Sequence, residues 1–279
     1  MQPYAKRVDM PLAVHGEVRD IGISPIVLSA ENVTVTFGGF VAVNGMNLVL
    51  RQHELHFLIG PNGAGKTTML DVICGKTKPA AGRVLLGDGL EITRKREYEI
   101  ARLGVGRKFQ APSIFPNLSV KENLELTVDP DRSVFRALKA RRNRCTTFEM
   151  KKVLELIGLP DRLHVRAGSL SHGEKQWLEI GMLLLQKPRL LLLDEPVAGM
   201  TDEETMKTGE LLQRIAKECS GVVVEHDMEF VRSFAAKVTV MHEGKLLKEG
   251  SMQEIQRDPL VAEVYLGRRR EANAQAAGH

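Results

Sequence analysis

The feature that most constrains this chain is a glycine-rich segment, Gly60-Pro61-Asn62-Gly63-Ala64-Gly65-Lys66-Thr67-Thr68. It matches G-x-x-x-x-G-K-[ST], the pattern of a phosphate-binding loop. The apolar run Leu55–Ile59 before it predicts a buried strand, and Met69–Cys74 after it predicts a helix that ends at Gly75. Because a strand, a glycine-rich turn and a helix are the context that this loop requires, the segment predicts a nucleotide site.

The loop divides its predicted chemistry between backbone and side chains. Its glycines let successive N–H groups turn toward a phosphate, and the N-terminus of the next helix adds partial positive charge. We expect Lys66 to hold the β- and γ-phosphates and the Thr67 hydroxyl to ligate Mg²⁺. The alternative is an ordinary glycine-rich turn, which the lysine and threonine disfavour. The loop alone does not distinguish a kinase, a GTPase, a helicase or a transport motor.

A second apolar run ends in acidic residues. Arg189–Leu193 predicts a buried strand, and Asp194-Glu195-Pro196 follows it. Since ligands in such folds bind at the carboxyl ends of the strands, we expect Asp194 to hold Mg²⁺ through a water, together with Thr67. Glu195 is then the candidate base that orients and polarises the attacking water. A solvated strand end is the alternative interpretation.

Three more side chains are candidates for the same site. His226 ends the predicted strand Gly221–His226 and is expected to reach the γ-phosphate or the attacking water, although a lone histidine there is more often structural. Gln110 ends the predicted strand Gly104–Gln110 and is expected to complete the Mg²⁺ shell. Phe37 precedes the turn of a predicted antiparallel hairpin, where stacking on a base and packing in the core are both open.

The segment Leu170-Ser171-His172-Gly173-Glu174 begins another predicted helix. Ser171 and Glu174 form a capping box, which explains the segment by local physics alone. The same helix N-terminus also suits an anion. We expect the topology to carry it away from the chain's own phosphate loop, so it would serve a phosphate only on a second subunit.

Predicted helices interrupt the α/β pattern between these motifs. Residues 119–168 read as helical throughout, with breaks near Asp129-Pro130 and Gly158-Leu159-Pro160. Ser119 and Glu122 predict a capping box at the first helix, and strands resume only after Arg189. This block predicts a helical subdomain inserted in an α/β core.

Composition excludes several classes. With a net charge of +4 and no basic surface interleaved with aromatics, the chain gives no indication of a nucleic-acid partner. The three cysteines show no metal spacing and suit a reducing compartment. No apolar run approaches the ~18 residues of a membrane span, and no signal peptide is recognisable, so we expect a cytosolic protein.

In this order and spacing, the motifs resemble those of the ATP-binding cassette (ABC) ATPases over about residues 27–268. The matching positions are Gly60–Thr68 (Walker A), Leu190–Glu195 (Walker B), Gln110 (Q-loop), Leu170–Glu174 (signature), Ala198–Thr201 (D-loop), His226 (switch histidine) and Phe37 (the aromatic that stacks on adenine). The sequence departs from the family pattern at His172, Glu174 and Thr201, which leaves the γ-phosphate contact and the coupling between sites open to tuning.

The resemblance implies a P-loop NTPase ABC ATPase fold with an antiparallel β subdomain and an inserted helical subdomain at about residues 111–187. Residues 1–26 and 269–279 are then tails. It implies ATP and Mg²⁺ as ligands, with Glu195, His226 and Lys66 catalytic. The implied ATP contacts are Phe37, Gly60, Pro61, Asn62, Gly63, Ala64, Gly65, Lys66, Thr67, Thr68, Gln110, Ser171 and Gly173, and the implied metal contacts are Thr67, Gln110 and Asp194.

The resemblance also implies partners. Two cassettes, identical or related, are expected to pair head to tail around two ATP, with Ser171 and Gly173 of one facing the loop of the other. Residues 110–118 would receive a cytoplasmic helix of integral-membrane permease subunits, and a solute-binding protein would act indirectly. The chain would then lie peripherally at the cytoplasmic face of the inner membrane and couple ATP hydrolysis to uptake.

Within the family the chain resembles the branched-chain amino-acid uptake group at Phe37-Gly38-Gly39, Gly106–Gln110 and Glu263–Gly267. The strings Leu170–Gly181 and Glu195–Thr205 look like the ATP-binding subunit of urea transporters, which favours urea over the alternative of branched-chain amino acids. A soluble ABC ATPase acting on nucleic acid is a weaker alternative. So is a GTPase, because the chain has no Asn-Lys-x-Asp motif, and the presence of Glu195 disfavours a non-hydrolysing cassette.

Overall fold

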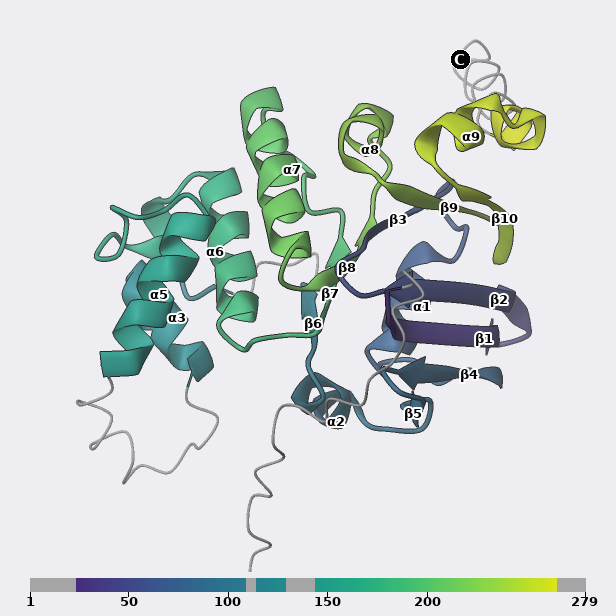
Figure 1. Ribbon diagram of the computed structural model, residues 1–279, viewed down its shortest axis with the longest axis horizontal. Helices are drawn as coiled ribbons and strands as arrows, with labels where there is room; N and C mark the ends of the chain where they lie inside the picture. The colour runs from purple at the N-terminus through teal and green to yellow at the C-terminus, as the bar shows by residue number, and fades with distance from the viewer. Residues whose placement is uncertain (1–23, 109–113, 129–143, 265–279) are drawn as a thin grey trace, which may run out of the picture.

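The computed structural model describes residues 24–108, 114–128 and 144–264, and its strands form two sheets (Figure 1). Sheet A contains β1 (Ile26–Phe37), β2 (Phe40–Arg51), β4 (Ala81–Leu86) and β5 (Leu90–Glu91), in the order β2-β1-β4-β5. Sheet B contains β3 (Leu55–Ile59), β6 (Val105–Lys108), β7 (Leu190–Asp194), β8 (Ser220–Val224), β9 (Lys237–His242) and β10 (Lys245–Gly250), in the order β10-β9-β3-β8-β7-β6.

Sheet B is parallel through its centre. β3, β8, β7 and β6 are neighbours with parallel pairing, which places Asp194 opposite Val224 and Lys108 opposite Leu193. Every residue of β3, β7 and β8 is buried, as expected for a parallel sheet covered on both faces. The carboxyl ends of these strands therefore lie at one edge, as predicted for the strands that precede Glu195 and His226.

Sheet A is antiparallel, and it confirms the hairpin predicted ahead of the glycine-rich segment. β1 pairs with β2 on one side and with β4 on the other. The turn between β1 and β2 is formed by Gly38 and Gly39, and both have positive φ angles that glycine adopts without strain. Phe37 and Phe40 are the paired residues beside this turn.

The described helices are α1 (Lys66–Ile73), α2 (Glu97–Arg102), α3 (Val120–Val128), α5 (Arg144–Leu156), α6 (His172–Leu184), α7 (Asp202–Ala216), α8 (Met228–Phe234) and α9 (Met252–Arg257). Several begin as predicted. The Ser119 hydroxyl accepts from the Glu122 N–H, and Ser171 caps α6 in the same way. The structure adds a third such cap, Thr201 at the start of α7. No helix in the described ranges combines the length and apolarity that a bilayer crossing requires.

The prediction that residues 119–168 are helical apart from two breaks is wrong for residues 159–166, which form turns. Pro160 disfavours a helix there. The carbonyls of this segment instead bind another helix: Val165 accepts from the Val120 N–H, and Leu163 accepts from the Lys121 N–H. These contacts satisfy N–H groups in the first turn of α3, which that helix cannot satisfy internally.

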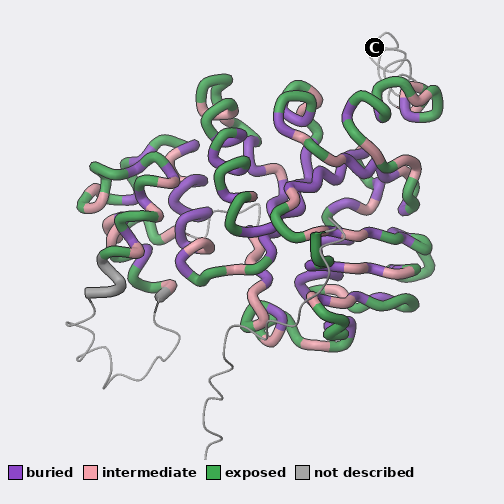
Figure 2. The backbone as a smooth tube through the Cα atoms, in the orientation of Figure 1, coloured by how far each residue is buried: buried purple, intermediate pink, exposed green. Residues whose placement is uncertain are grey.

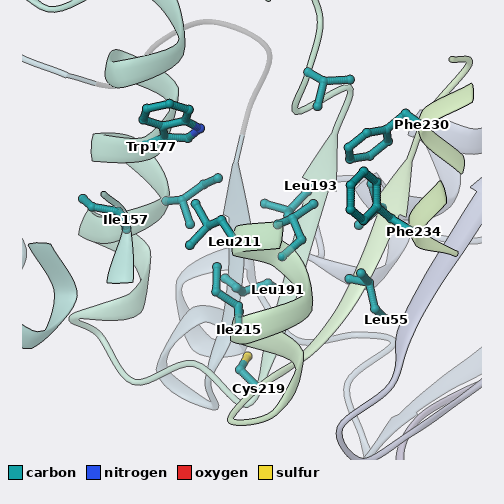
Figure 3. Close-up of a cluster of buried hydrophobic side chains, with 14 of the residues drawn as sticks. Leu55, Ile157, Trp177, Leu191, Leu193, Leu211, Ile215, Cys219, Phe230 and Phe234 are labelled. Atoms are coloured by element: carbon teal, nitrogen blue, oxygen red, sulfur yellow. The ribbon is translucent and has the colours of Figure 1, made fainter. Parts of the chain in front are cut away.

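Two clusters of buried apolar side chains lie on opposite faces of sheet B. Leu190 and Leu192 of β7 belong to the cluster beneath α1 and sheet A, whereas Leu191 and Leu193 belong to the cluster beneath α6, α7 and α8. Figure 2 shows the buried backbone concentrated along the central strands. Figure 3 shows Trp177 of α6 and Leu211 of α7 on the same side as Leu191 and Leu193. Successive residues of a strand thus serve different cores, as the two-residue period requires.

Candidate nucleotide site

The glycine-rich segment forms a tight loop between β3 and α1. A Cβ on Gly60 would lie 2.2 Å from the Met241 carbonyl oxygen, and one on Gly65 would lie 2.5 Å from the Ala42 carbonyl oxygen, so both positions require glycine. The Lys66 ammonium donates to the carbonyls of Gly60 at 2.8 Å and Pro61 at 2.9 Å. The loop therefore curls around its own lysine.

The helix after the loop begins at Lys66, three residues before the predicted start at Met69. It begins after Gly65, which has a φ of +97° and no side chain to cap the helix. An α-helix leaves N–H groups for an external acceptor at this end, and its dipole favours an anion there. Lys66, Thr67 and Thr68 are consequently in the first turn, the position expected of phosphate-binding residues.

Thr67, in the first turn of α1, and Asp194, the last residue of β7, lie beside each other, as predicted. The Thr67 hydroxyl lies 3.5 Å from Asp194 Oδ1, and Asp194 is only 2% exposed. Burial raises the pKa of Asp194, against the opposing effects of the Thr67 hydrogen bond and the Arg107 charge. A hydroxyl and a carboxylate are hard oxygen ligands of the kind that Mg²⁺ accepts beside a nucleotide, so the pair fits this ion.

Glu195 and His226 are also brought together. His226 Nδ1 lies 3.4 Å from Glu195 Oε1. Glu195 has a φ of +49°, in the left-handed region that a side chain rarely adopts, and its N–H donates to the Val224 carbonyl at 2.9 Å. Such a conformation costs about 1–3 kcal/mol and is concentrated at functional sites. The strained backbone directs Glu195 out of the strand while Asp194 remains buried in it.

Buried charges that the sequence analysis had assigned no role support these residues. Arg107 of β6 lies 2.5 Å from Asp71 on α1 and 3.8 Å from Asp194, on one face of sheet B. Lys108 is 1% exposed and lies 3.8 Å from Glu179 of α6, on the other face. The detectable signal in the sequence was two cations at the end of an apolar strand.

Burial shifts the pKa values of a cation and an anion near the site, Lys108 and Glu225, in opposite directions. Burial lowers the pKa of Lys108, although the charges of Glu179, Asp194 and Glu225 oppose that shift. Burial raises the pKa of Glu225, which accepts hydrogen bonds from the N–H groups of Val197 and His226. Glu225 therefore fixes the backbone on both sides of the site, after β7 and after β8.

The segment Leu170–Glu174 lies far from α1 across the molecule, as Figure 1 shows for α6 and α1. The Ser171 hydroxyl accepts from the Glu174 N–H and donates to the Glu204 carboxylate of α7 at 2.8 Å. Gly173 donates its N–H to the same carboxylate oxygen at 3.3 Å. Nothing in the sequence near Glu204 indicates this contact with the start of α6.

Two predicted residues lie apart from these contacts. Gln110 is outside the described residues, so its expected role stays a prediction. Phe37 lies at the turn of the β1–β2 hairpin and is 51% exposed, which favours the stacking role over a place in the core.

Comparisons with known proteins agree with this geometry. The family model described as "ABC transporter" matches residues 43–198. The high-affinity branched-chain amino acid transport ATP-binding protein BraF of Pseudomonas aeruginosa is 34% identical, covering 86% of this chain and 98% of that protein. Its counterpart LivG of Escherichia coli K12 is 34% identical, covering 88% of this chain and 99% of that protein.

Solved structures give the same result for the fold. An ATP-binding cassette of an ABC transporter in its ADP conformation superposes with a TM-score of 0.76 at 30% identity, covering 87% of this chain and 99% of that one. A nucleotide-free cassette from an ABC transporter gives 0.75 at 28% identity, covering 86% and 98%. Together with the two sheets, these confirm the predicted fold class.

Proposed function

The chain belongs to the ABC transporter family and is an ATP-hydrolysing subunit of an importer, and from this premise we propose that the imported solute is a branched-chain amino acid. The observation that supports this choice of solute is the 34% identity to two branched-chain amino acid transport proteins, over 98% and 99% of their lengths. The comparisons thus favour the alternative of the sequence analysis over its first choice, urea.

Urea is the second candidate. It is favoured by the strings Leu170–Gly181 and Glu195–Thr205, which surround the signature and the acidic strand end. Neither string lies where a solute would bind. The two strings therefore indicate a subgroup of cassettes by resemblance, and they do not recognise the solute chemically.

Uptake in a strain lacking this chain separates the two solutes. Labelled leucine and labelled urea are supplied to the deletion strain, with the wild-type chain or the Glu195→Gln chain returned. The proposal expects leucine uptake to return with the wild-type chain only and urea uptake to be the same in all strains. If urea uptake, and not leucine uptake, returned only with the wild-type chain, the branched-chain proposal would be rejected in favour of the second candidate.

The predicted roles of the site residues follow from their positions. The loop Gly60–Thr68 holds the phosphates of ATP, Lys66 exchanges its carbonyl contacts for the β- and γ-phosphates, and Phe37 stacks on adenine. Glu195 accepts a proton from the attacking water, and His226 orients that water or the γ-phosphate. Thr67 and Asp194 would hold Mg²⁺, which supplies positive charge against the phosphates.

The site is completed by a second cassette in this proposal. Ser171 and Gly173 belong to the start of α6, which lies across the molecule from α1 in Figure 1, and helix N-termini suit anions. A head-to-tail pair would bring these groups of one copy to the ATP of the other, so that ATP binding closes the pair and hydrolysis reopens it. Purification of the complex would identify the second cassette as another copy of this chain or as a related cassette.

A permease would dock on the helical side. Phe115 is exposed, and its neighbour Ile114 packs against the core. The two residues form a small apolar patch before α3. Docking there would place the chain peripherally at the cytoplasmic face of the membrane, with a solute-binding protein acting on the permease from the other side.

A further inference from the structure

The start of α6, which contains the signature segment Leu170–Glu174, binds a carboxylate of its own chain. One carboxylate oxygen of Glu204 accepts hydrogen bonds from the Ser171 hydroxyl at 2.8 Å and from the Gly173 N–H at 3.3 Å. The fit is close, because a Cβ on Gly173 would lie 2.6 Å from that same oxygen. The two donors proposed to reach a partner's γ-phosphate are therefore already engaged.

The remaining contacts of Glu204 anchor it on α7. Its other carboxylate oxygen accepts from the Thr201 N–H at 3.1 Å and from the Thr201 hydroxyl at 3.3 Å, as the third residue of a capping box. Hydrogen bonds from the Thr201 backbone and then from the Ser171 side chain lower the pKa of Glu204, so it is a carboxylate at neutral pH. A negative charge at a helix N-terminus is also favoured by the helix dipole.

The two helices are fastened to each other at this end. Four residues after Gly173 on α6 and four after Glu204 on α7, the Trp177 Nε1–H donates to the Thr208 hydroxyl at 2.8 Å. Helix packing therefore sets the position of Glu204 against Ser171 and Gly173, and a chance surface rotamer does not account for the contact.

We infer that Glu204 is a positioning residue that occupies the signature site until a partner's γ-phosphate displaces it, and that it thereby sets the ATP concentration at which two cassettes pair. The inference rests on the proposed function, since it needs a partner that brings a phosphate to this helix. Until then, Ser171 and Gly173 donate to the Glu204 carboxylate. A phosphate must take both donors from the carboxylate, and the like charge opposes its approach.

The test measures pairing against ATP concentration by light scattering of the purified full chain. Hydrolysis is suppressed in all samples by Glu195→Gln, so that the paired form accumulates. Glu204→Gln is compared with Glu203→Gln, which removes one charge from the same helical turn. Glu203 is 78% exposed and pairs only locally with Lys207 in the described contacts, which makes it the matched control. Glutamine serves as well as glutamate in a capping box, so α7 keeps its cap in Glu204→Gln.

The inference expects Glu204→Gln to lower the half-saturating ATP concentration for pairing about five- to tenfold, the difference between charged and neutral hydrogen-bond acceptors. Glu203→Gln should change it less than about twofold. ATP binding by the separate cassettes, measured by isothermal calorimetry below the pairing concentration, should be the same in all three proteins, and so should their melting temperatures.

Two results would overturn the inference. Pairing of Glu204→Gln at the same or a higher ATP concentration than Glu203→Gln would show that Glu204 does not compete with the phosphate. Failure of every protein to pair, with ATP binding intact, would reject head-to-tail pairing of two copies of this chain and the role of Glu204 in that pair.

Discussion

Glu195 Oε1 lies 3.4 Å from His226 Nδ1, across the ends of two adjacent parallel strands. The two residues follow β7 and β8, whose register places Asp194 beside Val224. The pairing of these two strands therefore brings together the carboxylate and the imidazole that follow them. The candidate catalytic pair therefore lies directly beyond the ends of two paired, fully buried strands.

Replacing Glu195 with glutamine should abolish most ATP hydrolysis. Removal of a general base lowers turnover by about 10²- to 10⁴-fold, while the loop contacts that bind ATP are unchanged. A steady-state phosphate-release assay should therefore show a lower kcat with KM within about threefold of the wild type. The control is Glu203→Gln, a similar change at an exposed site, and turnover of Glu195→Gln equal to that control would remove Glu195 from the role of base.

Phe37→Ala should weaken ATP binding. Base stacking on an aromatic side chain contributes about 1–3 kcal/mol, so the Kd for ATP should rise at least about fivefold. Phe40 is the matched control, because it is paired with Phe37 across the same turn and is 66% exposed. Calorimetric titration that gives equal Kd values for Phe37→Ala and Phe40→Ala would contradict the stacking role.

Asp194→Asn should raise the melting temperature by a few degrees at neutral pH while weakening binding of Mg-ATP. Burial raises the pKa of Asp194, so the folded state binds its proton more tightly than the unfolded state does. The ionised carboxylate therefore destabilises the fold fully above the raised pKa, and this cost disappears as pH falls below the ordinary aspartate value of about 4.

The check is calorimetric melting of both proteins without nucleotide from pH 8 down to the lowest pH at which they remain folded. The advantage of Asp194→Asn should shrink steadily as pH falls. An advantage that is absent at pH 8, or that grows on acidification, would contradict the assigned cause.

Lys108→Met should destabilise the fold strongly, because it leaves Glu179 buried without its cation. Breaking a buried pair at one partner costs about 3–5 kcal/mol, whereas replacing both partners with apolar residues is often nearly neutral. We expect the double variant Lys108→Met/Glu179→Leu to recover most of the loss in urea unfolding midpoint.

The surface pair Lys187–Glu149 is the control, with N···O at 2.6 Å and the Lys187 side chain 74% exposed. Lys187→Met should cost less than about 1 kcal/mol despite the shorter distance, because exposed pairs are screened by solvent. Equal losses for Lys108→Met and Lys187→Met would mean that burial of Lys108 does not govern its contribution.

Local signals explain what could be predicted from the sequence. The loop Gly60–Thr68, the capping boxes at Ser119 and Ser171 and the buried strand before Asp194 each depend on residues within a few positions of one another. Side chains at the ends of neighbouring strands could also be grouped, because parallel strands present their carboxyl ends at one edge. This was enough to predict an α/β core with an inserted helical subdomain and to group Thr67, Asp194, Glu195 and His226 at one site, whereas the ABC ATPase fold followed from the family resemblance.

Contacts between distant elements could not be predicted in the same way. Nothing near Lys108 in the sequence indicates that Glu179 of α6 will lie beside it, and nothing near Glu204 indicates its contacts with Ser171 and Gly173. The segment before α6 was misread as helical because its role, accepting the N–H groups of Val120 and Lys121, depends on a helix some 40 residues earlier in the chain.

The alternation of side chains across sheet B limits which insertions and deletions this chain can accept. At the end of β6, consecutive residues send Arg107 to the α1 face and Lys108 to the α6 face. β7 likewise assigns alternate leucines to two cores. Losing one residue from either strand would exchange these assignments and place the wrong charge on each face. Length variation among related chains should therefore be confined to the loops between the strands and helices. The strands themselves should keep a fixed number of residues, so that each side chain stays on its own face of the sheet.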